Sequence, residues 1–246
     1  MDFYLAIISF LAAFIFSLGG VGAAIILIPI MDAFGIPISI AKPVGLFYNT
    51  ISLAGASANN IKNNRLDFKL GIPLIIFSFI FASVGAYLSQ YIPSRIVLIM
   101  FVGFLLFSSC MFLFFKKKDE TIFREDIPYF PLALIGAFAG LLSGILGIGG
   151  GGIISPLLLV MGFNPKKITT LTAFVVPFSS LSGFLTYWSI GSVNWKLIAI
   201  TAIAGILGAT IGTSIMQKKL NPKTVKKILA IILIIIAIKM GAKIIY

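Results

Sequence analysis

The feature that most constrains this chain is a series of apolar runs, each long enough to cross a membrane as a helix. A spanning helix needs about 17 to 25 apolar residues to cover the roughly 30 Å of hydrocarbon in a bilayer. These runs do not alternate every second residue, which excludes a transmembrane β-barrel. The sequence therefore predicts an all-α polytopic membrane protein with eight hydrophobic blocks. The blocks cover residues 3–31, 43–61, 68–90, 94–115, 129–161, 169–190, 195–216 and 223–246.

Composition agrees with this class and excludes several functions. Of the 246 residues, 59% are hydrophobic and 11% are charged, which is too little polar surface for a water-soluble globule. The net charge of +12 comes from basic residues that lie mainly in loops between the blocks, so we expect it to orient the chain in a membrane rather than to bind nucleic acid. The chain has no histidine and a single cysteine, Cys110. We therefore expect no metal site, no cofactor and no enzymatic activity.

The chain divides near its middle into two related halves. A charged linker over residues 116–128, which begins KKKDETIFRED, separates a first transmembrane repeat over 1–115 from a second over 129–246. Aligning Pro29 with Pro156 sets Gly20-Val-Gly22 against Gly147-Ile-Gly149. Because such matches fall in order and on the rarer residues, we predict that the halves are homologous.

The distribution of Lys and Arg tests the topology, because the cytoplasmic side of a membrane protein holds the excess. If all eight blocks cross, the 19 basic residues divide almost evenly. If the overlong first and fifth blocks bend at their glycines and return, all but five fall on the face of the linker. Each half then keeps three crossings, which predicts an inverted repeat with both termini outside and a cytoplasmic linker. A broken helix that spans is the simpler alternative.

The densest unusual signal is the run of glycines in the fifth block. Glycine inside a helix costs about 1 kcal/mol relative to alanine, so we expect the helix to break there. Unpaired backbone inside a membrane is tolerated where it lines a wet cavity, and the N–H groups at the start of a half-helix can hold an anion. The alternative is that the glycines only allow close contact between helices. The predicted binding glycines are Gly19, Gly20 and Gly22 in the first half, and Gly149, Gly150, Gly151 and Gly152 in the second.

Polar residues in the helix after each break form a second group of candidates. Asn49 and Thr50 in the first half, and Thr170 and Ser180 in the second, can donate hydrogen bonds to an anion without the desolvation cost of a fixed charge. Bonding of the hydroxyls back to their own helix is the competing interpretation.

Three ionisable residues are candidates for coupling transport to a gradient. Asp32 and Asp67 are the only acids outside the N-terminus and the linker, so either could carry a coupling proton. Lys42 is close to the membrane interior, where an ionisable group is a candidate functional residue. Solvated positions for the acids, and a lysine that reaches the headgroups, are the alternatives.

The order of a glycine break, a later proline, a Gly-Pro turn and a Ser/Thr-bearing helix, repeated once, resembles the TauE/SafE family of sulfite-exporter-like permeases. The matching stretches are GGVGAAIILIPIMDAFGIP and GIGGGGIISPLLLVMGFNP. The first departs from the pattern, with Ala23 and Ala24 where glycines are expected. The resemblance implies transport of sulfite, sulfoacetate or another small sulfur-containing or organic anion, driven by a proton gradient or the membrane potential.

We therefore predict a multi-pass secondary transporter of the cell (inner or plasma) membrane, in contact with lipid. It would move a small anionic solute by alternating access around the two glycine breaks. The expected assembly is a monomer or a small homo-oligomer. The competing hypothesis is a non-transporting membrane subunit whose linker docks a soluble partner. A channel is a third option, although the rings of like charge typical of channels are missing from the sequence.

Overall fold

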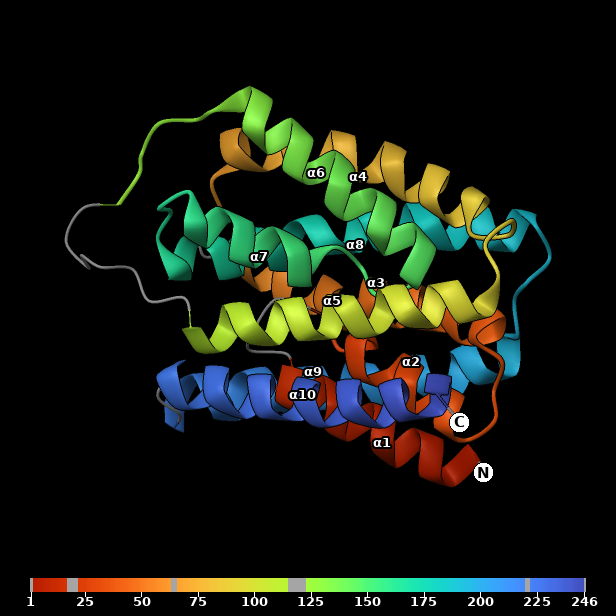
Figure 1. Cartoon of the computed structure of the whole chain (residues 1–246). Coiled ribbons are helices and arrows are strands. Elements are labelled where there is room, and N and C mark those ends of the chain that lie inside the picture. The colour runs from red at the N-terminus through yellow and green to blue at the C-terminus, as the bar shows by residue number, and fades with distance from the viewer. Residues whose placement is uncertain (1, 17–21, 63–65, 115–122, 220–221, 246) are drawn as a thin grey trace.

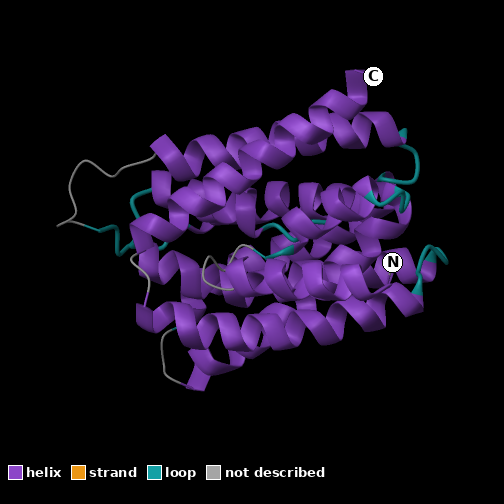
Figure 2. Cartoon of the chain, turned by 90° about the horizontal axis from the view of Figure 1, so that it is seen from below, coloured by secondary structure: helices purple, strands orange, loops and turns teal. Residues whose placement is uncertain are grey.

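The computed structural model describes residues 2–16, 22–62, 66–114, 123–219 and 222–245. Over these residues every regular element is an α-helix. The first half contributes α1 (Asp2–Phe16), α2 (Ala24–Ala33), α3 (Ile38–Lys62), α4 (Phe68–Leu88) and α5 (Ser94–Phe114). The second half contributes α6 (Tyr129–Leu146), α7 (Gly151–Val160), α8 (Pro165–Ser189), α9 (Trp195–Lys219) and α10 (Pro222–Ile245). Figures 1 and 2 show most of these helices running between the same two ends of one bundle.

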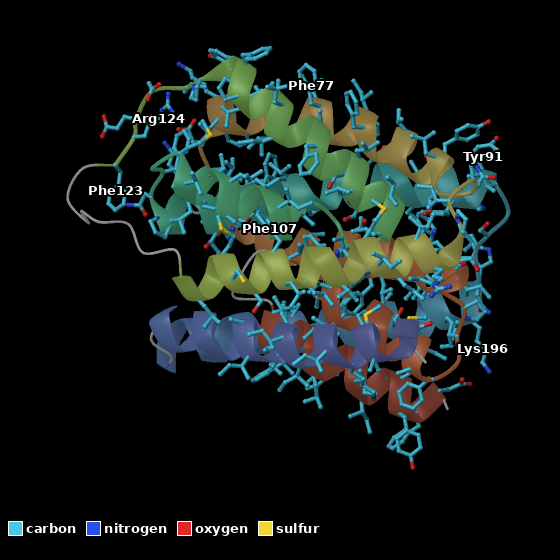
Figure 3. All side chains as sticks on the ribbon, in the orientation of Figure 1. Phe77, Tyr91, Phe107, Phe123, Arg124 and Lys196 are labelled. Carbon is cyan, nitrogen blue, oxygen red and sulfur yellow. The ribbon has the colours of Figure 1, made fainter. Side chains whose placement is uncertain are left out.

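The bundle presents the surface that a lipid bilayer requires. Large apolar side chains such as Phe77 and Phe107 are exposed on its flanks, whereas Arg124 and Lys196 lie at opposite ends (Figure 3). Among the described residues, five helices are long and apolar enough to cross a membrane. They are Phe68–Leu88, Ser94–Met111, Tyr129–Leu146, Lys167–Ser189 and Trp195–Gly212. The prediction of an all-α polytopic membrane protein is confirmed.

The fifth hydrophobic block forms two helices and returns to the end of the bundle where it began. α6 and α7 are separated by residues 147–150, which are not helical. The backbone N–H of Arg124, just before α6, donates to the carbonyl of Gly162, just after α7, over 3.0 Å. Because this bond joins the segment before α6 to the turn after α7, the block is a hairpin whose two ends lie at the same end of the bundle.

The first block is broken in the same way. At the start of α1, Asp2 pairs with Lys196 at the start of α9, over 2.6 Å. At the end of α2, Ala33 lines a pocket together with Lys239, near the end of α10. Since α9 starts and α10 ends at one end of the bundle, α1 and α2 together also return to it. Both termini lie at this end, opposite the segment that joins α5 to α6 (Figure 1).

Two long helices, α3 and α8, form the centre of the bundle. They pack against each other, with the rings of Phe47 and Phe184 4.8 Å apart between centroids. α4 packs against α6 and α8, while α9 packs against α1 and α3, and α5 packs against α10. The short helices α2 and α7 lie against α3 and α8, respectively. This arrangement brings the two interrupted segments to the central pair.

Glycines allow α6 to approach α4 unusually closely. Gly136, Gly140 and Gly144 are spaced four residues apart, so they share one face of α6. A Cβ added to Gly140 would lie 2.7 Å from the Cα of Ser78, and one added to Gly144 would lie 2.5 Å from the amide nitrogen of Ala86. This is the small-residue contact that brings helix backbones together in a membrane. This contact fixes the position of α6, the helix of the hairpin that leads to the break.

We expect Gly140→Leu to destabilise the protein by separating α4 from α6. Overfilling a close contact costs about 1–3 kcal/mol, and the obstacle here is backbone, which has little room to move. Thermal unfolding of the purified protein in detergent measures the effect. Gly103→Leu on α5 is the matched control, because a Cβ at Gly103 meets nothing within 4 Å. Equal unfolding temperatures for the two variants would contradict the role given to this contact.

Candidate functional site

The break between α6 and α7 is built from backbone conformations that glycine adopts without strain. Gly147 ends α6 at φ +81°, and Gly149 has φ +65°, both in the left-handed region. Gly150 precedes the first residue of α7. The prediction of a break is confirmed, but its extent is corrected: Gly151 and Gly152 are helical and form the start of α7. A helix's first residues make few intrahelical bonds, so glycine there disturbs less than in the interior.

Asn49 joins this break to the one in the first half. It lies near the middle of α3 and is fully buried. Its Oδ1 accepts a 3.0 Å bond from the N–H of Ala24, the first residue of α2. Its Nδ2 donates a 2.7 Å bond to the carbonyl of Ile148, inside the second break. The Asn49 side chain therefore joins the start of α2 to the break between α6 and α7, in the middle of the bundle.

Ser180 meets the same segment from α8. A Cβ added to Gly149 would fall on the Ser180 hydroxyl and would lie 2.7 Å from Asn49 Nδ2. The Ser180 Oγ is buried and has no hydrogen-bond partner in the described structure. Most buried polar atoms have a hydrogen-bond partner. The Ser180 hydroxyl, which lies against the non-helical backbone of the break, is therefore a candidate ligand-binding group.

Lys42 completes the contacts to the break. It is buried, and its Cα and the start of its side chain lie where a Cβ on Gly147 would point. Lys42 and Asn49 are seven residues apart on α3, so they share one face of that helix. Of the consecutive residues of the break, Gly147 lies against Lys42, Ile148 bonds to Asn49, and Gly149 faces both Ser180 and Asn49.

The break in the first half is described only in part. Gly22 has φ +88°, and a Cβ there would lie 2.7 Å from both terminal atoms of the Asn49 amide. Gly19 and Gly20, which we also predicted to bind, lie outside the described residues. The structure brings Gly22, Asn49, Gly149 and Ser180 together, and α7 starts beside them.

Thr50 and Thr170 are not part of this cluster of contacts. The Thr50 hydroxyl donates to the carbonyl of Leu46 over 3.0 Å, and that of Thr170 donates to Lys167 over 3.0 Å, each within its own helix. Thr170 is also ten residues from Ser180 along α8, which is about 15 Å of helix. Their predicted contact with substrate remains untested.

The two acids predicted for coupling lie at opposite ends of the bundle. Asp67 caps α4, accepting from the N–H of Leu70 over 3.3 Å, and pairs with Lys167 over 2.6 Å. The Lys167 ammonium holds the pKa of the Asp67 carboxyl below its usual range. A capping, paired carboxylate is explained by helix stability. Its coupling role remains a prediction.

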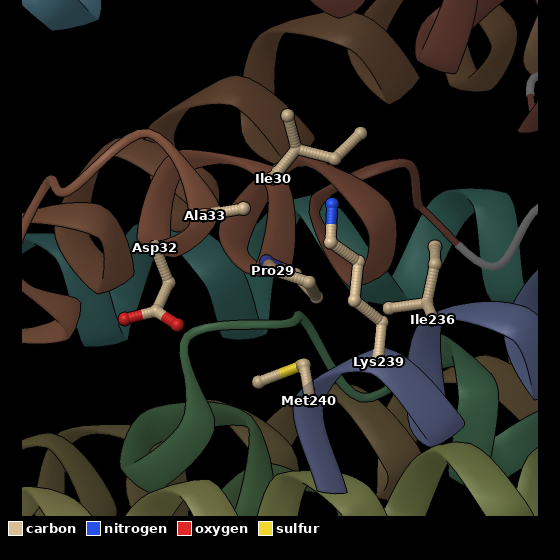
Figure 4. Close-up of a pocket in the computed structure, with 7 residues that line it drawn as sticks. All are labelled: Pro29, Ile30, Asp32, Ala33, Ile236, Lys239 and Met240. Atoms are coloured by element: carbon tan, nitrogen blue, oxygen red, sulfur yellow. The ribbon is translucent and has the colours of Figure 1, made fainter. Parts of the chain in front are cut away.

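Asp32 is buried on α2 and lines a pocket of about 250 Å³ that opens between α2 and α10. Pro29 and Ile30 belong to the same wall, while Lys239 and Met240 approach from α10 (Figure 4). Since the N–H of Ala24 at the start of α2 bonds to Asn49, the pocket lies at the other end of this helix from the break. Of the two acids proposed for coupling, Asp32 lies on α2, the helix that follows the break in the first half.

Two residues near the break were not predicted from the sequence. Ser89, at the end of α4, accepts a hydrogen bond from the Lys42 ammonium and donates to the carbonyl of Ile145 over 3.2 Å. Tyr187 on α8 donates to the carbonyl of Gly144 over 2.9 Å. Both lie at helix ends that resemble ordinary interfacial positions, and no local pattern in the sequence pairs them with a break tens of residues away.

Comparison with known proteins places this chain in a family. The family model described as "Sulfite exporter TauE/SafE" matches residues 5–240. The chain belongs to the TauE/SafE family. It is 30% identical over 245 residues to a probable membrane transporter protein of Methanocaldococcus jannaschii, covering 93% of this chain and 91% of that one. It is 28% identical to the probable membrane transporter protein YunE of Bacillus subtilis, covering 98% and 96%, respectively.

The TauE/SafE relatives also include plant proteins. The "Sulfite exporter TauE/SafE family protein 6" of Arabidopsis thaliana is 32% identical over 103 residues, which are 42% of this chain and 24% of the plant protein. No solved structure shows a significant match to the chain. The family and its members named as probable transporters identify this TauE/SafE protein as a multi-pass membrane transporter of a small solute.

Proposed function

We propose that this protein is a secondary transporter that moves a small anion, sulfite or another sulfur-containing or organic anion, across the cell membrane. The observation that carries the proposal is the meeting of both breaks at Asn49, deep in an apolar bundle. Burying such polar backbone in a membrane is costly unless it is used or fully paired. The printed name of the family, sulfite exporter, supports sulfite as the first anion to test.

The chemistry of the site favours an anion over a cation. The starts of α2 and α7 place the positive ends of two helix dipoles at the breaks, each equivalent to about half a unit charge. Neutral donors stand beside them in Asn49 and Ser180. We assign the binding role to these two side chains and to the glycines of the two breaks, Gly19, Gly20, Gly22, Gly149, Gly150, Gly151 and Gly152.

Alternating access in this proposal rests on an inverted repeat. What supports the repeat is the correspondence of helix contacts: α4 packs on α6 and α8, as α9 packs on α1 and α3, and the equivalents α2 and α7 lie on α3 and α8. Rocking of α4, α6, α7 and α8 as one group against α1, α2, α3 and α9 as the other would open the breaks to each face in turn. The basic residues near the linker support a cytoplasmic linker and external termini.

Flux in proteoliposomes tests the proposal. The purified chain is reconstituted and the movement of labelled sulfite is measured with and without an imposed pH gradient, with sulfate and acetate as comparators. Saturable movement of one anion, faster with the gradient, is the expected result. If no anion moves, the proposal fails and a membrane subunit that docks a soluble partner becomes the better hypothesis.

We expect Ser180→Ala to raise the KM for the anion by about tenfold, the loss expected for one hydrogen bond to a charged group. Since the hydroxyl has no hydrogen-bond partner among the described residues, its removal should leave the unfolding temperature unchanged or slightly higher. Ser57→Ala is the comparison, because Ser57 donates to Ala173 over 2.6 Å and its loss should act on stability instead. A KM equal to that of the wild type would remove Ser180 from the site.

A further inference from the structure

A buried lysine without a carboxylate partner stands at the end of the break. Only 4% of Lys42 is exposed. The ion pairs formed by the described residues do not include it; they join Arg124 to Asp126, Lys167 to Asp67 and Lys196 to Asp2. Charged groups removed from water are normally paired, because desolvation is expensive. A lysine ammonium in this position is therefore stabilised by any negative charge that comes near it.

The protein supplies only part of that charge. The Lys42 ammonium donates to the Ser89 hydroxyl and lies 5.4 Å from the centre of the Tyr187 ring, a cation–π contact. Ser89 and Tyr187 in turn donate to the carbonyls of Ile145 and Gly144 in the last turn of α6. That helix end carries partial negative charge only, so no full opposite charge among the described residues compensates the ammonium.

The location of Lys42 connects this charge to the break. Lys42 contacts Gly147, and on the same face of α3, two turns further on, Asn49 holds Ile148. The partners of the ammonium are a neutral hydroxyl and a neutral ring, both of which an anion can displace without leaving a buried charge. A buried cation at the end of α6, against the glycine that opens the break, is suited to bind a small oxyanion there.

We propose that Lys42 is the cationic binding group for the transported oxyanion, with Ser89 and Tyr187 holding its ammonium beside the break until the anion binds. This inference rests on the function proposed above and adds a fixed positive charge to its neutral donors. It also gives the anion a defined approach: Lys42 lies nearer than Asn49 to the start of α3, at the end of the bundle that carries the termini.

Binding of sulfite to the purified full-length chain tests this proposal without needing transport. The unfolding temperature in detergent is measured against sulfite concentration at constant ionic strength, for the wild type, Lys42→Met and Lys42→Arg. A ligand of the folded state raises this temperature in a concentration-dependent way. We expect Lys42→Met to need at least about tenfold more sulfite for the same rise, the loss expected when a charged donor is removed. Lys42→Arg, which keeps the charge, should retain more of the response than Lys42→Met.

The controls separate binding from folding. Replacing a buried charge with an apolar side chain of similar length is often neutral or stabilising, so Lys42→Met should unfold no earlier than the wild type without sulfite. Lys69→Met removes the same charge from an exposed position on α4 and should leave the sulfite response unchanged. An equal response in Lys42→Met and the wild type, or no response in the wild type, would overturn the proposal. Sulfite binding through Lys42 without flux would retain this site and reject only the transporter proposal.

Discussion

Replacing Gly149 with alanine is expected to abolish anion flux while the chain still inserts into the membrane. An L-residue at the φ of +65° found there costs about 1–2 kcal/mol of backbone strain. The new methyl group would also fall on the Ser180 hydroxyl and within 3.0 Å of Val176 Cγ1, and such overfilling costs about 1–3 kcal/mol more. The segment can escape only by moving away from Asn49 and Ser180. Flux of labelled sulfite and the amount of protein extracted from the membrane measure the two effects.

Gly191→Ala separates the effect of backbone strain from the effect of the added methyl group on the packing of the break. Gly191 has φ +82°, comparable to Gly149, but a Cβ there meets nothing within 4 Å. It lies in the turn between α8 and α9, at an end of the bundle. We expect Gly191→Ala to lose a similar amount of stability through the backbone and to keep most of the flux. Flux in Gly149→Ala at the level of Gly191→Ala would mean that the shape of the break is not required for transport.

Much of the architecture could be predicted because the thickness of the bilayer fixes the length of a spanning helix. The two blocks that were too long, residues 3–31 and 129–161, are the two that break, and the charged residues at 116–128 separate α5 from α6 as expected. Counting basic residues also favoured the hairpins that the structure contains. Each of these features depends on local composition, which a sequence states directly.

The partners within the site could not be predicted, because they depend on contacts between distant segments. Asn49 was selected as an amide inside a helix, but its bond to Ile148 joins residues 99 positions apart. Gly140 was not selected, since its contact with Ser78 becomes visible only when α4 and α6 lie together. The run of four glycines at 149–152 was expected to break the helix over its whole length. It divides at Gly151 because α7 can begin on glycine without losing interior helix bonds.

The two halves contribute different chemistry to the proposed site. The second half provides the long glycine break and Ser180, whereas Asn49 and Lys42 come from α3 in the first half. Aligning Pro37 with Pro165, one residue out of register with Pro29 and Pro156, places Thr170 opposite Lys42, so the fixed charge has no equivalent in the second half. If α1, α2, α3 and α9 rock as one group against α4, α6, α7 and α8, α3 carries the positive charge with it. The charge would then approach and leave the break formed by Gly147 to Gly150 during each transport cycle.

Replacing Asn49 with alanine is expected to have the second large effect, on stability and affinity together. The change leaves the N–H of Ala24 and the carbonyl of Ile148 buried without their partner. Each unsatisfied group costs about 1–3 kcal/mol, so a total loss of about 2–6 kcal/mol in the free energy of unfolding follows. The anion also loses a donor, and the start of α2 is no longer held against the second break. Thermal unfolding and the KM for flux at a permissive temperature measure the two consequences.

Asn194→Ala is the matched control for this variant. Asn194 also accepts from a backbone N–H at a helix start, that of Leu197 over 3.2 Å, but it makes this bond at an end of the bundle. Loss of such a cap costs about 1 kcal/mol. We expect Asn194→Ala to unfold somewhat earlier and to keep the KM of the wild type. If Asn49→Ala behaves in the same way, Asn49 is only a helix cap. If it raises KM beyond what the loss of folded protein explains, the junction of the two breaks is where the anion binds.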